Sequence, residues 1–199
     1  MATLAPLGAA ALAKRVLRYL VATSDLGINY FGGKEAEDEK KLTCYCDASF
    51  APHGTISYTG LCLMWLGSPL LWRAVKQQMV SQSTAEAELQ AMAAGQQLTM
   101  AVREILGELG VEVSPEILGD NQAAISLAKN GGTWRSRHFA VKASALRQAF
   151  RLGWATVGFV SSEHQLADMM TKLLGAAISR RLREAIGMGA AVDFFGTGV

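Results

Sequence analysis

Four acidic residues stand where a strand or a helix is expected to end or begin. Asp47 ends one strand-like run and Asp120 follows another, while Glu88 and Asp168 lie in the first turns of two expected helices. Carboxylate oxygens are the ligands that Mg²⁺ prefers, and two such ions about 4 Å apart can activate water and stabilise a leaving oxygen in phosphoryl chemistry. The four acids are therefore candidates for one shared metal site.

Three of these acids also have a purely structural interpretation. Asp47 could lie in a turn after its strand, and Asp120 could do no more than cap the following helix. Asp168 could pair with Lys172 one helical turn later. Spacing alone leaves both interpretations open.

Glu88 is the acid that is hardest to explain structurally. It lies in the longest helical pattern of the chain, which runs to about Leu109 and is expected to begin at a cap formed by Ser83 or Thr84. Glu86 occupies the capping-box position, and at about 100° per residue it faces away from Glu88. Glu86 shares a polar face with Gln82, Gln90 and Gln97, and Glu88 an apolar one with Ala85, Ala91, Met92 and Gly95. A carboxylate directed into packed apolar surface is costly without a partner or a metal. We therefore expect Glu88 to be functional and Glu86 to be a capping residue at the surface.

The elements that must position these acids follow from the hydrophobic pattern. The order from residue 42 onward is three strands, the long helix, a strand, two helices, a strand and a helix, which predicts a mixed α/β fold whose first three strands form an antiparallel meander. The expected strands are 26–31, 42–47, 57–66, 70–75, 116–119 and 154–160. The expected helices are 8–22, the long one to Leu109, 122–129, 140–152, 166–174 and 176–186. The Gly-rich end is expected to be loose.

Composition restricts the class of protein. Half of the 199 residues are hydrophobic, which is enough for a core and argues against disorder. The three cysteines, Cys44, Cys46 and Cys62, are too few and too poorly spaced for a zinc site or a disulfide framework, so we expect core residues in a reducing compartment. No apolar run is long enough to span a membrane. An intracellular protein, cytoplasmic or nuclear, is expected.

A charge run after Gly32 and Gly33 predicts a domain boundary. Residues 34–41 contain almost only acidic and basic side chains, which are typical of a solvated linker. The expected division is a connecting helix, strand and linker in 1–41, a main domain in 42–175, and a C-terminal helix and tail in 176–199.

A second charge pattern predicts a nucleic-acid contact. Residues 121–162 contain six basic and no acidic side chains, while the whole chain has a net charge of only +2. Guanidinium and ammonium groups with an aromatic and a His suit phosphate contact and base stacking, although a solvated helix face remains an alternative. The candidate contacts are Lys129, Trp134, Arg135, Arg137, His138 and Lys142.

Several motifs, in this order and spacing, resemble the ribonuclease H region of copia-type LTR retrotransposon polyproteins. They are Tyr45–Ala48, Trp72–Gln77, Ser83–Leu89, Gly119–Ala124 and Gln165–Lys172. Residues 13–27 resemble the segment that links reverse transcriptase to that region, so the likeness covers roughly residues 10–174. No motif of a reverse transcriptase active site, an integrase or a protease is present, so a fragment, a processed piece or a domesticated remnant is expected.

The resemblance implies a fold, a cofactor and a reaction. The fold would be ribonuclease H-like, with a five-stranded mixed sheet flanked by helices. Asp47 would bridge two Mg²⁺ ions, with Mn²⁺ as the alternative metal. Asp120 would help hold the ion that activates water, and Glu88 and Asp168 the ion on the leaving-group side. The implied reaction is hydrolysis of the RNA strand of an RNA–DNA hybrid, and the implied partners are that hybrid and the rest of a retrotransposon polyprotein with its reverse transcriptase.

Some positions depart from the family pattern. Ala140, Ala143 and Ser144 replace an Asp and an aromatic-His pair, and Gln82 replaces a Ser. No expected metal ligand is lost, but a catalytically silent hybrid-binding or scaffold module is a competing hypothesis. Another nuclease or integrase-like protein of the same broad fold is a weaker one.

Overall fold

The computed structural model describes residues 6–30, 40–52, 54–130 and 140–190. Its strands are β1 (Leu26–Ile28), β2 (Lys41–Ser49), β3 (Tyr58–Trp65), β4 (Ser68–Lys76), β5 (Ser114–Gly119), β6 (Thr156–Phe159) and β7 (Met188–Ala190). Its helices are α1 (Pro6–Ala22), α2 (Thr84–Glu108), α3 (Gln122–Asn130), α4 (Ala140–Arg151), α5 (Asp168–Thr171) and α6 (Ala176–Ala185), and a 3₁₀ turn, η3, covers Ser162–His164.

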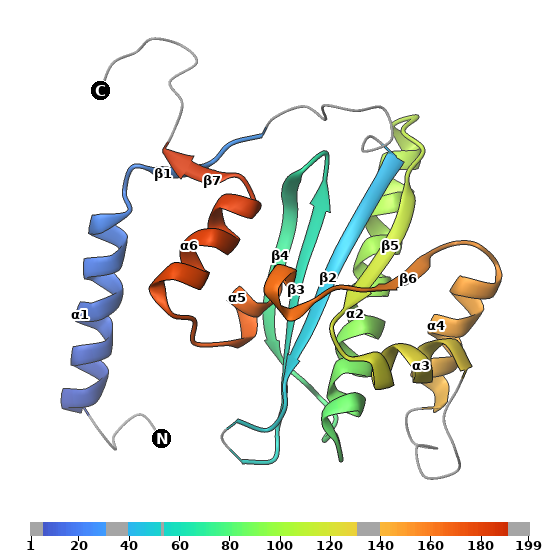
Figure 1. Ribbon diagram of the computed structural model, residues 1–199, viewed down its shortest axis with the longest axis horizontal. Helices are drawn as coiled ribbons and strands as arrows, with labels where there is room; N and C mark the ends of the chain where they lie inside the picture. Colours follow the sequence, from blue (N-terminus) through green and yellow to red (C-terminus); the bar gives the residue numbers. More distant parts are fainter. Residues whose placement is uncertain (1–5, 31–39, 53, 131–139, 191–199) are drawn as a thin grey trace.

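A five-stranded mixed sheet forms the centre of the molecule (Figure 1). Its order is β4-β3-β2-β5-β6, so β2 is the middle strand. The pairs β3–β4 and β2–β3 are antiparallel, whereas β2–β5 and β5–β6 are parallel. The expected mixed sheet with an antiparallel start is confirmed.

Helices pack against both faces of the sheet, because β2 presents buried apolar side chains on one face and Cys62 and Met64 of β3 are buried on the other. Cys44 and Cys46 are fully buried against α2, which confirms them as core residues. Gly95 makes this contact possible, since a Cβ there would collide with the Cys46 sulfur. On the opposite face, α6 contributes buried apolar residues to a second cluster. That cluster contains Cys62, Met64, Leu166, Leu182 and Ile186.

The two ends of the described chain meet in a small second sheet. β1 pairs antiparallel with β7, with Leu26 opposite Ala190 and Ile28 opposite Met188. β7 follows α6 directly, and α1 lies at the outer side of α6 (Figure 1). The strand expected near residue 26 is therefore present, whereas its partner near residue 189 was not expected from the sequence.

Two sequence-based expectations for the C-terminal part were wrong. The helix expected over 166–174 is a single turn, α5, preceded by η3 without a side-chain cap. The cause is Gln165, whose fully buried side chain bonds to the backbone of β2 and so holds this segment out of helical geometry. Residues 188–190 form a strand, where a loose Gly-rich end was expected.

Within the described residues, every helix is too short or too polar to cross a lipid bilayer.

Candidate metal centre

Asp47 lies inside the middle strand rather than in a turn. It is third from the end of β2, and only 1% of its surface is exposed. Its cross-strand neighbour is Gly60, whose missing side chain leaves room for α5, since a Cβ there would lie 2.6 Å from the Thr171 methyl and 2.9 Å from the Ala167 carbonyl oxygen. The turn interpretation of Asp47 is therefore excluded, and Gly60 brings α5 close to it.

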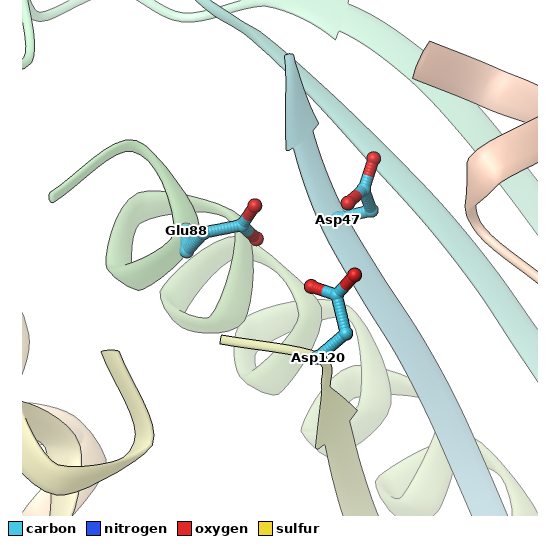
Figure 2. A group of neighbouring side chains, drawn as sticks. All are labelled: Asp47, Glu88 and Asp120. Atoms are coloured by element: carbon cyan, nitrogen blue, oxygen red, sulfur yellow. The ribbon is translucent and has the colours of Figure 1, made fainter. Parts of the chain in front are cut away.

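Glu88 reaches the same place from the first turns of α2. Ser83 caps this helix, with its hydroxyl accepting from the N–H of Glu86, and the Glu86 carboxylate accepts from the N–H of Gln82 at 2.7 Å. The expected cap at Ser83 is confirmed, and Glu86 bonds back to the backbone just before it, but Glu86 is 7% exposed and so is not a surface residue. Gln90, on the same face, is buried as well, because the segment that enters α2 folds over this face. Glu88 is turned away from the Ser83 cap toward Asp47 (Figure 2).

Asp120 lies directly after β5, whose parallel pairing with β2 sets both strand ends at one edge. It does not cap α3, because the side chain of Asn121 accepts the N–H of Ala124 at 3.0 Å and performs that role. The Asp120 carboxylate instead accepts from the Ser162 hydroxyl at 3.0 Å. The purely capping interpretation of Asp120 is therefore wrong.

The three carboxylates point toward one another (Figure 2). One oxygen from each of Asp47, Glu88 and Asp120 lies within 4.8 Å of the other two. Glu88 is 5% exposed, and its buried Oε2 has no hydrogen-bond partner among the described residues. An orphaned carboxylate oxygen inside a cluster of oxygen ligands fits a divalent cation, because a cation would satisfy its lone pairs and offset the mutual repulsion.

The pKa of Glu88 shows that its surroundings disfavour the charged carboxylate. Burial, and to a smaller extent the nearby charges of Asp47 and Asp120, raise the pKa of Glu88 to about 9. A hydrogen bond from the backbone of Ala48 and the charge of Lys172 act in the opposite direction. Without a bound cation, Glu88 is therefore held in its neutral form at pH 7.

Asp168 lies beside this trio and is connected to it through Lys172. The Lys172 ammonium donates to Asp168 Oδ1 at 2.6 Å and to Asp47 Oδ1 at 3.2 Å, and it lies 4.0 Å from Asp120 Oδ2. The Thr171 hydroxyl donates to the other Asp47 oxygen. Burial raises the pKa of Asp168, while the hydrogen bond from Lys172 lowers it. Lys172 is partly buried, which lowers its pKa, but Asp168 and Asp47 outweigh this and raise it to about 12.

The expected pairing of Asp168 with Lys172 is therefore present. It does not separate Asp168 from the other acids, because Lys172 also donates to Asp47. The structure groups Glu88 with Asp120, whereas the resemblance implied that Glu88 works with Asp168. Asp168 is connected to Asp47 through the Lys172 ammonium, which donates to both carboxylates.

Two buried glutamines hold the elements of the centre in place. Gln165 donates to the carbonyl of Cys46, next to Asp47, and accepts the N–H of Ala167 just before α5. Gln77 donates to the Ala87 carbonyl and to the Thr59 hydroxyl, which fixes the first turn of α2 against β3. Buried hydrogen bonds of this kind cost about 1–3 kcal/mol when one partner is lost.

The candidate nucleic-acid contacts are only partly visible. Trp134, Arg135, Arg137 and His138 lie outside the described residues. Lys129 is exposed in the last turn of α3. Lys142 is half-buried, which lowers its pKa, and its ammonium donates to the side-chain oxygen of Gln90 at 3.0 Å, so it joins α4 to α2.

Sequence reasoning missed the roles of Gly60, Ser162 and Thr171, and the contacts of Lys172 beyond its predicted pairing with Asp168. A signal existed for the last two, since Thr171 and Lys172 follow Asp168 by three and four residues and therefore share its helical face. For Gly60 and Ser162 the decisive partners are distant in sequence, so only the fold reveals them.

The chain is similar to several retrotransposon polyproteins. It is 33% identical over 181 residues, 88% of its length, to the retrovirus-related Pol polyprotein from transposon RE2 of Arabidopsis thaliana. It is 32% identical over 181 residues to that of transposon RE1 from the same plant, and 25% identical over 163 residues, 80% of its length, to the transposon Ty1-DR5 Gag-Pol polyprotein of Saccharomyces cerevisiae. The chain spans 12%, 12% and 9% of the lengths of these relatives. No protein-family model matches it.

A solved structure supports the fold independently. LC11-RNase H1, isolated from compost by a metagenomic approach, matches 72% of this chain and 99% of its own, with a TM-score of 0.50 and 15% sequence identity. The likeness in structure agrees with the sheet order described above, and the likeness in sequence agrees with the motifs around the acids. The chain is a homologue of one segment of the retrotransposon Pol polyproteins, and its fold is that of ribonuclease H.

Proposed function

We propose that this chain is a metal-dependent endoribonuclease that hydrolyses the RNA strand of RNA–DNA hybrids during retrotransposon reverse transcription. The observation that carries the proposal is the convergence of Asp47, Glu88 and Asp120 around a buried Glu88 oxygen that has no hydrogen-bond partner in the described part of the chain. Three clustered acids are unfavourable unless a cation offsets their repulsion, so their presence in one place indicates a function rather than a contribution to stability. The ribonuclease H fold and the Pol homologues support the same conclusion.

The proposed cofactors are two Mg²⁺ ions, for which Mn²⁺ could substitute. Asp47, Glu88 and Asp120 would hold one ion, and Asp47 with Asp168 the other, which follows the grouping of the side chains. When bound, such ions lower the pKa of water and neutralise charge on a leaving oxygen.

The protein itself contributes a rigid arrangement. Asp47 is fixed in the middle strand, Glu88 by the capped start of α2, and Asp120 by its bond from Ser162. In the proposed reaction, a water oxygen bonds to phosphorus and the bond to the 3′ oxygen breaks. That oxygen takes up a proton, which leaves 3′-hydroxyl and 5′-phosphate ends. Carboxylates that are already in position need little reorganisation during this step.

The hybrid is the proposed substrate because of the basic segment 121–162. Its charge suits a phosphate backbone, and the 2′-hydroxyls of the RNA strand distinguish it from DNA. Among the described residues, Lys129 is free to contact phosphate at the surface of α3. Lys142 would contact the hybrid only at the expense of its bond to Gln90.

We further propose that the chain works beside a reverse transcriptase in a polyprotein. The named relatives are much longer Pol polyproteins. In addition, α1 exposes a series of apolar side chains that a neighbouring domain would cover. These are Leu12, Val16, Leu17, Leu20 and Val21.

The test is incubation of the full chain with an RNA–DNA hybrid whose RNA strand is labelled, with and without Mg²⁺. We expect cleavage only with the metal, and a loss of at least about 10²-fold in the Asp47→Asn variant, because a ligand common to both ions is gone. Binding of the hybrid without cleavage would favour the silent module that the changes at Ala140, Ala143 and Ser144 suggest. Cleavage that is unchanged in Asp47→Asn would refute the proposed site.

A further inference from the structure

Lys172 places a positive charge inside the acidic centre. Its ammonium donates to Asp168 and Asp47 at 2.6 and 3.2 Å and lies 4.0 Å from Asp120, so one cationic group serves three of the four acids. Glu88 differs from these three, because its buried Oε2 has no hydrogen-bond partner among the described residues. The positive charge is therefore distributed unevenly over the centre.

This unevenness divides the centre into two halves. In the first half, Asp47, Glu88 and Asp120 bring three carboxylate oxygens within 4.8 Å of one another. In the second half, Asp47 and Asp168 direct an oxygen each at the Lys172 ammonium. A cation is still needed to satisfy Glu88 in the first half, whereas Lys172 already supplies one in the second.

An ammonium group and a divalent ion compete for the same carboxylate lone pairs. A metal held by Asp47 and Asp168 would have to take over the oxygens to which Lys172 donates, and two cations so close together would repel each other. Lys172 can give way, because its side chain is 39% exposed and lysine carries its charge on a flexible four-carbon stem. Thr171, which holds the other oxygen of Asp47, would keep that carboxylate in place during the exchange.

We propose that Lys172 is a built-in cation that occupies the Asp47–Asp168 half of the centre and competes with the metal ion there. The first half, which contains Glu88, then binds its ion before the second half does. The second ion binds only when the Lys172 side chain moves out toward solvent. This inference rests on the proposed function, since it assumes that the centre binds divalent metal. It assigns to Lys172 the control of how readily the second ion enters.

The experiment counts bound Mn²⁺ ions on the full 199-residue chain by electron paramagnetic resonance, at neutral pH and without nucleic acid. The wild type is expected to bind one ion, and a second at least about ten-fold more weakly. Lys172→Met is expected to tighten the second ion by about ten-fold and the first by less than about three-fold, because the competing charge is removed only from the second half. Lys172→Gln, which keeps a hydrogen-bond donor, gives the same readout if the Met variant does not fold.

Lys76→Met is the matched control, because Lys76 is an exposed lysine on β4. It should leave both affinities unchanged. The proposal for Lys172 is overturned if its neutral variants leave the second ion unchanged or weaken it, or if the wild type binds two ions equally well. If neither the wild type nor the variants bind Mn²⁺, the proposed function fails together with this inference.

Discussion

At the scale of single residues, the centre shows a conflict between stability and function. Asp47 and Glu88 are almost completely buried, although burial disfavours their charged forms. Lys172 compensates Asp47 and Asp168. Within the residues that the structure describes, Glu88 has only the backbone N–H of Ala48 as a hydrogen-bond donor and the more distant charge of Lys172 in its favour. A neutral substitute at Glu88 is therefore expected to stabilise the metal-free protein.

The first prediction concerns the stability of the metal-free protein. The folded-state pKa of Glu88, about 9, lies above its ordinary value of 4.5, so the folded chain holds this proton more tightly than the unfolded chain. The contribution of the tightly held Glu88 proton to the free energy of unfolding is complete below pH 4.5, and it is lost as the pH rises toward 9. Glu88→Gln should therefore increase the free energy of unfolding relative to wild type by roughly 1–3 kcal/mol between pH 5 and pH 8.

Urea unfolding in a metal chelator at several pH values measures this difference. Glu86→Gln is the control, because its amide oxygen can still accept from the N–H of Gln82. If the difference in free energy of unfolding between wild type and Glu88→Gln stays constant from pH 5 to pH 8, the pKa of Glu88 is not raised in the folded protein.

At the scale of elements, the sequence predicted the helices and strands that have a strong local signal. The capped start of α2 and the apolar alternation of β2 are local patterns, so both elements and the burial of Glu88 followed from the sequence. The strand β7 and the short α5 did not, because β1 and the backbone of β2 determine them through contacts that are distant in sequence. Asn121 and Asp120 were equally good caps by type, and only the fold shows which one faces the other acids.

The second prediction tests the contact between α2 and the sheet. Gly95→Ala should lower the free energy of unfolding by roughly 1–3 kcal/mol, since its Cβ would collide with Cys46 and lie 3.2 Å from the Cys44 sulfur. Gly107→Ala is a matched change in the same helix, where a Cβ meets nothing within 4 Å. It should stabilise the protein by up to about 1 kcal/mol through helix propensity. Equal effects of the two substitutions in thermal unfolding would contradict the close packing at Gly95.

At the scale of the whole molecule, the C-terminal helix shares the core of the main sheet. The division into 1–41, 42–175 and 176–199 remains a prediction. Leu182 of α6 and Ile186, which directly follows that helix, are nevertheless buried in one cluster with Cys62 and Met64 of β3. In addition, β7 is the partner of β1, so the segments on either side of the main domain are joined. No charge or hydropathy pattern in the sequence indicates that these two segments pair.

The third prediction follows from that packing. A chain that ends after Gly175 should lose roughly 3 kcal/mol or more of unfolding free energy relative to one that ends after Ala190, because two buried apolar side chains and β7 are removed. Urea unfolding of the two chains measures the difference. Equal stability would show that the chain up to Gly175 gains nothing from α6 and β7.

The most direct test of metal-dependent RNA hydrolysis at this site compares the two glutamates of α2. They lie two residues apart in one helical turn, both are buried, and only Glu88 points at Asp47 and Asp120. With a labelled RNA–DNA hybrid and Mg²⁺, Glu88→Gln is predicted to reduce cleavage by at least about 10²-fold, and Glu86→Gln by less than about 3-fold. Equal losses in the two variants, or full activity in Glu88→Gln, would contradict the assignment of this centre.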